Sequence, residues 1–149
     1  MTEAREPLSA VRESEEPSGR SVQSFEDLKV WQACRELRLL VAAFVKTLPG
    51  SEKHRLADQM LRAARSTTAN IAEGYGRFHY QENIQFCRQA RGSLYEVLDH
   101  FISAHDEALA TEEELRKARA LIDKALALLN GYINYLRKAK ANSSKTRSD

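Results

Sequence analysis

Apolar side chains recur along most of this chain at alternating spacings of three and four residues, the period of an amphipathic helix. The first such stretch begins at Ser24, which forms a capping-box pattern with Asp27, and it stops before Pro49-Gly50. Its apolar positions are Val30, Cys34, Leu37, Val41, Phe44 and Leu48. The pattern predicts a first long helix.

A second helix is predicted after Ser51, which is placed to cap it. Its inner stripe consists of small and apolar residues, namely Leu56, Met60, Ala63, Thr67 and Ile71. Gly74 is expected to end this helix as a left-handed C-cap, and Gly76 to let the chain turn again. The predicted junction between the second and third helices therefore runs from Asn70 to Arg77.

The third helix is expected to begin near Tyr80, and its seam comprises Ile84, Cys87, Arg91, Leu94, Leu98, Phe101 and His105. Thr111 and Glu114 form a capping box for a fourth helix that extends to about Lys140. The apolar arc of the fourth helix is wide, because Leu121, Leu126, Leu128, Ile133 and Tyr135 lie outside its main seam. This width fits either a contact with another subunit or deeper burial within one copy.

Four long helices with short connections predict an all-α fold, an antiparallel up-down-up-down four-helix bundle over residues 24–140. Residues 1–23 are rich in Glu, Ser, Pro and Arg, which predicts a disordered leader, and residues 141–149 are expected to form a disordered basic tail. With 149 residues, 42% hydrophobic and 30% charged, the chain fits one domain. No apolar run is long enough to span a bilayer, so we expect a cytoplasmic protein without membrane contact.

Charge is distributed unevenly around a small net value of +2. Residues 53–91 contain seven Lys or Arg and three acids, whereas residues 92–136 contain four bases and eight acids. The bundle should therefore have a basic side and an acidic side.

The sequence offers no constellation typical of an enzyme. No Glu precedes a histidine by three residues, as a di-iron bundle would require, and His100 and His105 are five residues apart, which points them in different directions. Cys34 and Cys87 fall at apolar helical positions and are expected to be buried thiols. We therefore expect no catalysis, no metal and no cofactor.

A polar stripe runs along the second helix and its exit, through Arg62, Ser66, Asn70, Glu73 and Arg77. Arg91 falls in the apolar seam of the third helix, where its guanidinium needs a partner, and Glu73 is the nearest carboxylate by topology. We interpret Asn70, Glu73 and Arg91, together with Gly74 and Gly76, as a structural junction. A ligand site is the alternative for the three polar residues.

The other basic residues of this half are candidates for nucleic-acid binding: Lys53, Arg55, Arg62, Arg65, Arg77 and Arg88, with Tyr75 as a stacking surface. Phe78, His79 and Tyr80 follow closely and add ring faces for unpaired bases. An ordinary solvated helix face explains the same charges equally well.

Four segments resemble a known family: Ser24-Phe25-Glu26-Asp27-Leu28-Lys29-Val30-Trp31-Gln32, Leu56-x-x-Gln59-x-x-Arg62-Ala63, Asn70-Ile71-Ala72-Glu73-Gly74-Tyr75-Gly76-Arg77 and Ala90-Arg91-Gly92-Ser93-Leu94-x-Glu96. The chain resembles the four-helix-bundle 23S rRNA-intervening sequence proteins, which are related to accessory variability proteins of diversity-generating retroelements. It departs at Thr67 and Cys87, where the family usually has aliphatic residues, and both replacements stay small or apolar.

The resemblance implies a homo-oligomer, a pentamer in this family, with a basic surface. It also implies a non-catalytic RNA- or DNA-binding accessory factor of the intervening-sequence or retroelement type. The alternative is a protein-interaction scaffold that binds a partner such as a reverse transcriptase without touching nucleic acid.

Overall fold

The computed structural model describes residues 22–147, which form four long helices and no strand. The helices are α2 (Lys29–Val45), α3 (Asp58–Tyr75), α4 (Tyr80–Asp106) and α5 (Glu112–Lys145). Two 3₁₀ turns, η1 (Phe25–Asp27) and η2 (Gly50–Glu52), and a π-helical turn, η3 (Lys53–Ala57), lie between or before them. The predicted all-α four-helix bundle is confirmed.

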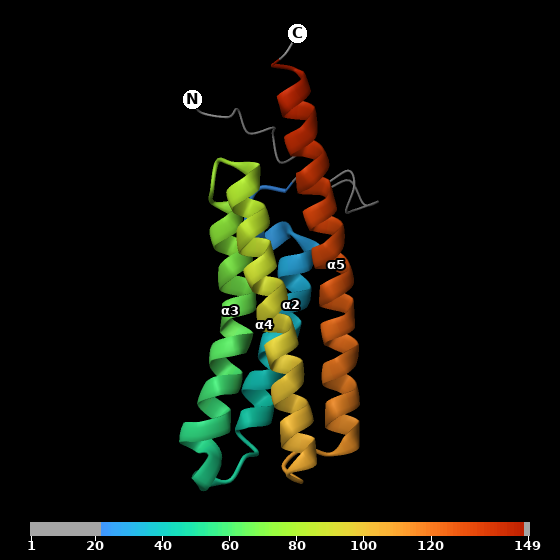
Figure 1. Cartoon of the computed structure of the whole chain (residues 1–149). Helices are drawn as coiled ribbons and strands as arrows, with labels where there is room; N and C mark the ends of the chain where they lie inside the picture. Colours follow the sequence, from blue (N-terminus) through green and yellow to red (C-terminus); the bar gives the residue numbers. More distant parts are fainter. Residues whose placement is uncertain (1–21, 148–149) are drawn as a thin grey trace.

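The chain runs along one helix and returns along the next (Figure 1). Hydrogen bonds link the beginning of α4 to the later part of α5, from Lys140 Nζ to Gln81 Oε1 at 2.6 Å and from Asn83 Nδ2 to the Tyr132 hydroxyl at 3.1 Å. Neighbours in sequence therefore pack side by side, which short connections favour.

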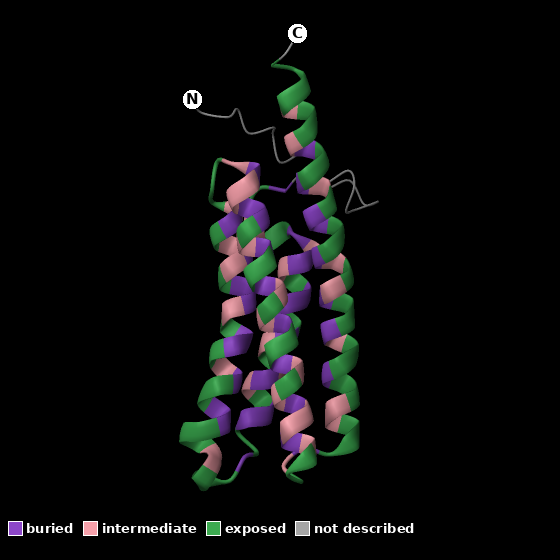
Figure 2. Cartoon of the chain, in the orientation of Figure 1, coloured by how far each residue is buried: buried purple, intermediate pink, exposed green. Residues whose placement is uncertain are grey.

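The core lies along the bundle axis, where the buried stripes of the helices meet (Figure 2). All six apolar positions predicted for the first helix and all five inner positions predicted for the second are buried. The rings of Phe44 on α2 and Phe101 on α4 lie 4.9 Å apart between their centroids. Cys34 and Cys87 are buried free thiols, as predicted.

The predicted seam of α4 was partly wrong. Ile84, Cys87, Leu94 and Phe101 are buried, but Arg91, Leu98 and His105 are only half-buried. Their places in the core are taken by Ala90, Val97 and Ala104, each fully buried. A spacing of three or four fits both choices, and the small alanines let the neighbouring helices approach closely.

The capping boxes differ in what they cap. The Thr111 side chain accepts from the Glu114 backbone N–H and starts α5 as predicted. The Ser24–Asp27 box exists, but it caps the turn η1, and α2 begins only after Leu28. Ser51 lies inside η2 and caps no long helix, which corrects that prediction.

The two predicted tails differ in how much of each the structure describes. Residues 1–21, most of the predicted leader, lie outside the described residues. Val22, which also belongs to the predicted leader, is buried, with only 9% of its surface exposed. Helix α5 continues to Lys145, so the prediction of a disordered tail from residue 141 was wrong for residues 141–145. The end of α5 extends past the other helices in Figure 1. None of the described helices is long and apolar enough to cross a membrane.

The wide apolar arc of α5 is largely accounted for within one copy. Ile133 is buried, while Leu121, Leu126, Leu128 and Tyr135 are half-buried. Helix α5 packs against both α2 and α4, and polar contacts mark both sides, from Lys124 to Glu36 at 3.2 Å and from Arg91 to Asn130 at 3.1 Å. A helix with two neighbours needs a wider apolar face than a single seam provides.

Candidate nucleic-acid interface

The junction between α3 and α4 is held by close backbone packing at Gly74. Gly74 is buried inside α3, and a Cβ atom there would lie 2.7 Å from Asn83 Oδ1 and 2.9 Å from Phe86 Cβ. The predicted left-handed C-cap was wrong, because α3 continues to Tyr75 and Gly76 has φ −72°. Glycine is needed here for space, since the start of α4 presses against its Cα.

Asn70 belongs to a polar layer between α3 and α4. Its Nδ2 donates to the backbone oxygen and to Oγ of Ser66, both at 2.9 Å. Ser66 Oγ lies 2.9 Å from Ser93 Oγ on α4. Asn70 is therefore hydrogen-bonded within α3, and the Ser66 hydroxyl that it contacts is the group that links α3 to α4.

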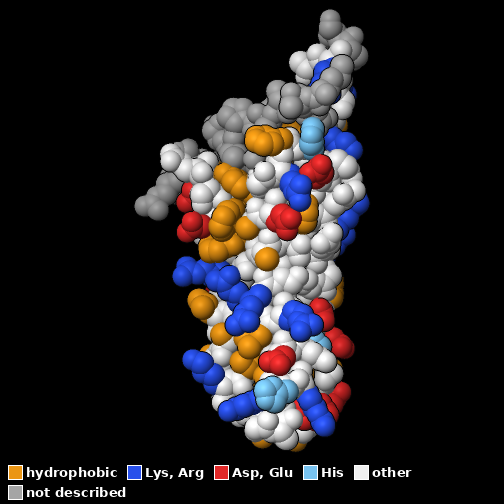
Figure 3. Space-filling view, turned by 90° about the vertical axis from the view of Figure 1, so that its left-hand side faces the viewer, with side chains coloured by type: hydrophobic (Ala, Val, Ile, Leu, Met, Phe, Trp, Pro, Cys, Tyr) orange, Lys and Arg blue, Asp and Glu red, His pale blue; other side chains and the backbone are white. Residues whose placement is uncertain are grey.

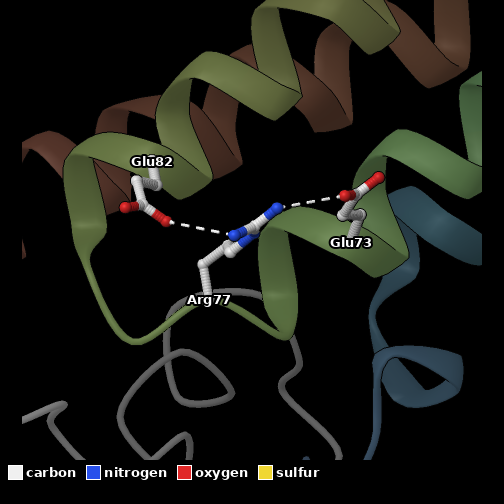
Figure 4. Close-up of polar contacts among 3 residues, drawn as sticks. All are labelled: Glu73, Arg77 and Glu82. Carbon is white, nitrogen blue, oxygen red and sulfur yellow. Dashed lines mark hydrogen bonds and ion pairs between the residues drawn. The ribbon is translucent and has the colours of Figure 1, made fainter.

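Arg77 is held by two carboxylates (Figure 4). Its guanidinium lies 3.1 Å from Glu73 Oε1 and 3.8 Å from Glu82 Oε2, and its Cζ lies 5.1 Å from the centre of the Phe86 ring. Two acids therefore flank this one base. Arg77, a candidate phosphate ligand in the sequence, is therefore already compensated.

The predicted clamp between Glu73 and Arg91 was wrong. Arg91 Nη1 donates to Asn130 Oδ1 on α5 at 3.1 Å, while Glu73 pairs with Arg77. The packing of Gly74 against Asn83 and Phe86 places the end of α3 a turn or more before Arg91 along α4. Arg91 is only half-buried and lies outside the buried seam of α4, so its guanidinium needs no buried carboxylate.

Tyr75 packs within an aromatic cluster. Its ring centroid lies 6.4 Å from that of Phe25, which in turn lies 5.3 Å from Trp31, and Arg35 Cζ lies 5.9 Å from the Trp31 ring centre. Tyr80 is 6% exposed, so it presents no ring face. The exposed ring at this end is Phe78, at 68%.

The remaining basic candidates lie at the surface. Arg62 and Arg65 are exposed on the outer side of α3, and with Asp58 and Leu61 they line an open polar cleft of about 320 Å³. Neither arginine has a hydrogen bond or an ion pair within 4 Å with another described residue, and the same holds for Arg88 on α4, although the Asp58 carboxylate lies in the same cleft and 4.0 Å from His54 Nδ1. Lys53 and Arg55 are exposed in η3 at the start of this side.

Figure 3 views the α3 side of the molecule and shows Lys and Arg side chains across its middle and lower part. Sequence reasoning missed one contributor on α2, Arg38, whose Nη1 donates to Thr68 Oγ1 on α3 at 2.9 Å. Its position directly after the buried Leu37 was the available signal, since such a residue borders a neighbouring helix. The structure thus brings Arg62 and Arg65 together and leaves Arg77 at a separate, compensated corner.

The first turn of α5 carries opposite charge. Glu112, Glu113 and Glu114 occupy it, and a hydrogen bond from Arg116 lowers the pKa of the exposed Glu113 carboxyl. No group of three or more His, Cys, Asp or Glu side chains within residues 22–147 is arranged to hold a metal ion. His100 Nε2 lies 3.5 Å from Glu96 Oε1 without the geometry of a hydrogen bond.

Comparison with known proteins places this bundle in a family. The family model for the 23S rRNA-intervening sequence protein matches residues 26–131, which include all of α2, α3 and α4 and most of α5. No curated protein matches the sequence significantly. Because the match covers well over half of the 149 residues, the chain belongs to the 23S rRNA-intervening sequence protein family.

Proposed function

We propose that this chain is a non-catalytic, homo-oligomeric accessory protein that binds RNA or DNA through the outer side of α3. The observation that carries the proposal is the open cleft beside Arg62 and Arg65, where one acid, Asp58, lies beside two arginines that form no ion pair within 4 Å with a residue of 22–147. Two exposed arginines beside a single acid keep a net positive charge on this helix face, which suits phosphate contacts that position a nucleic acid without reading its bases.

Arg88 and the exposed Lys53 and Arg55 extend this positive surface, and Arg77 is left out of it because Glu73 and Glu82 surround it. Binding through such contacts releases counterions, so affinity should fall steeply as salt rises. Sequence preference should be weak where the arginines contact phosphates, because phosphate contacts carry no base information directly.

The test is a fluorescence-anisotropy titration of a structured RNA and of duplex DNA at two salt concentrations. Replacing both Arg62 and Arg65 by Ala should weaken binding at low salt and reduce the slope of log affinity against log salt by about 2. Arg116→Ala, which removes one positive charge from the acidic start of α5, is the matched control and should change little. Wild-type affinity that is absent or independent of salt would refute the proposal.

The homo-oligomer, a pentamer by resemblance to the family, is supported by large apolar side chains left at the surface. Leu39 on α2 is 54% exposed and Tyr95 on α4 is 56% exposed. Light scattering of the full chain measures the mass directly. A monomer at micromolar concentration would remove the oligomer from the proposal and leave the nucleic-acid face intact.

A second candidate function, a scaffold that binds a protein such as a reverse transcriptase, is favoured by Phe78. This ring is exposed and follows Arg77, which two acids already pair, and an exposed aromatic ring without a free base beside it suits a protein contact better than a phosphate backbone. A pull-down that recovers protein but no nucleic acid, and that Phe78→Ala abolishes while Arg62→Ala does not, would favour the scaffold. The neighbouring genes would show which genetic setting applies.

A further inference from the structure

A second cavity lies at the end of the bundle away from the α3–α4 junction. It has a volume of about 230 Å³ and is lined by Leu40, Ala43, Phe44, Thr47, Phe101, Glu114 and Lys117. These residues come from the last turns of α2 and the turn that follows it, the late part of α4 and the first turns of α5. None belongs to α3, so this cavity is independent of the proposed nucleic-acid surface.

The floor of the cavity is aromatic and reaches the core. Phe101 is fully buried and Phe44 is 5% exposed, and their rings are tilted by 43° with centroids 4.9 Å apart. A third ring entering from outside can pack against this pair with the offset or edge geometry that aromatic groups prefer. Ala43 on the exposed side of α2 has too short a side chain to close the opening.

The size of the cavity limits what it can hold. A cavity of about 150 Å³ accommodates benzene, and sites for drug-sized ligands begin near about 300 Å³. A volume of 230 Å³ therefore fits a single ring with a short substituent.

The charged groups at the rim of the cavity indicate which substituent a bound ring should carry. The Glu114 carboxylate already accepts the Thr111 backbone N–H at 3.0 Å and faces the positive end of the α5 dipole. The Thr47 hydroxyl donates to the Phe44 carbonyl oxygen at 2.6 Å. The Lys117 ammonium, by contrast, forms no hydrogen bond or ion pair within 4 Å with a described residue. Its charge acts on the Glu113 carboxyl, but the hydrogen-bond partner of Glu113 is Arg116, so Lys117 is the rim group available to a ligand.

We propose that this cavity binds a small aromatic carboxylate, with its ring on Phe44 and Phe101 and its carboxylate at Lys117. The ligand enters between α2 and α5, beside Ala43. The bound ligand would contact α2, α4 and α5 at once and stabilise this end of the bundle by mass action.

The experiment uses 4-fluorophenylacetate as the probe and follows its fluorine NMR signal during titration with the full chain. A ligand of this size should bind with a dissociation constant on the order of 1 mM. Ala43→Leu, which fills the opening from an exposed position, should abolish the shift without unfolding the protein. Lys117→Gln should weaken binding about threefold to fivefold, the range of an exposed ion pair.

Two controls decide the assignment. Lys124→Gln removes another lysine of α5, one that pairs with Glu36 on α2, and it should leave probe binding unchanged. The uncharged probe 4-fluorobenzyl alcohol should bind wild type and Lys117→Gln equally. The proposal is overturned if no saturable shift appears by about 10 mM, ten times the expected constant, if Ala43→Leu still binds, or if Lys117→Gln affects both probes alike.

Discussion

The arginine at the C-terminal end of α3 and the arginines in its middle have different charged neighbours. At the end, Arg77 lies between Glu73 and Glu82 and over Phe86, next to a glycine packed against α4. In the middle, Arg62 and Arg65 line an open cleft with Asp58 and form no ion pair within 4 Å with a described residue. Basic residues on one helix and its exit can therefore be structural at one place and available for a ligand at another.

The difference follows from what lies opposite each residue. The start of α4 brings Glu82 and Phe86 to the end of α3, so Arg77 finds partners on a second helix. The outer side of the middle of α3 faces solvent, and its inner side holds Met60, Ala63 and Thr67 in the core. Arg62 and Arg65 share their cleft with one acid, Asp58, whereas Arg77 alone has two acids within 4 Å, so the arginine pair is the better candidate for binding an anion.

The largest effect at neutral pH is expected from Gly74→Ala, which tests whether the end of α3 is fixed by packing. The new Cβ would lie under 3.0 Å from Asn83 Oδ1 and Phe86 Cβ, so α3 and α4 must separate. We expect a loss of about 1–3 kcal/mol in the free energy of unfolding, measured by urea denaturation.

Gly92→Ala is the matched control, because Gly92 lies within α4 and a Cβ added there would have nothing within 4 Å of it. That change should stabilise the protein by about 0.5–1 kcal/mol through helix propensity. Equal effects of the two substitutions would show that the junction is not sterically tight.

Tyr132→Phe should have an effect in the same range, and it tests the hydrogen bond between α4 and α5 near the junction. The Tyr132 hydroxyl accepts from Asn83 Nδ2 at 3.1 Å, and both residues are buried. Removing the oxygen leaves a buried amide donor without this partner, which should cost about 1–3 kcal/mol in chemical denaturation. An unchanged midpoint would mean that Asn83 finds another acceptor.

The burial of Cys34, which lies on α2 against Thr67 on the inner side of α3, can be tested by the pH dependence of stability. Burial raises the pKa of Cys34 from 9.0 to about 12, and a hydrogen bond with Thr67 opposes the shift only in part. The unfolded thiol loses its proton first as pH rises, so this group should reduce stability by about 1.4 kcal/mol per pH unit between pH 9 and 12.

Comparing the unfolding free energy of wild type and Cys34→Ala across that window isolates the contribution of the thiol. The variant loses the thiol-dependent slope while keeping the other titrating groups. Identical pH slopes would show that Cys34 is not held in a dry site behind the basic surface.

The smallest effect is expected from Arg77→Ala. Its guanidinium contacts are about half-exposed, so the ion pairs with Glu73 and Glu82 should contribute at most about 1 kcal/mol. Nucleic-acid affinity should change less than in Arg62→Ala at the same salt concentration, as measured by anisotropy. A larger loss of affinity in Arg77→Ala would reverse the comparison between the two regions.

The chain pattern predicted which elements form better than it predicted which side each residue faces. Val30, Leu37 and Val41 define the buried face of α2 by spacing alone. The seam of α4 was ambiguous because Ala90 and Arg91 both fit the same period, and the choice depends on where α5 lies. Gly74 was identified as special, but its reason is a contact with α4 rather than a left-handed turn.

The sequence by itself determined the four-helix architecture, the buried thiols and the capping box at Thr111, because each depends on local spacing and on the hydrophobic effect. Only the tertiary structure decided that Arg77 is compensated, that Arg91 pairs with Asn130, and that Arg62 and Arg65 share an open cleft. Pairing between helices depends on their relative rotation and axial offset, which a repeat of three and four residues leaves undetermined.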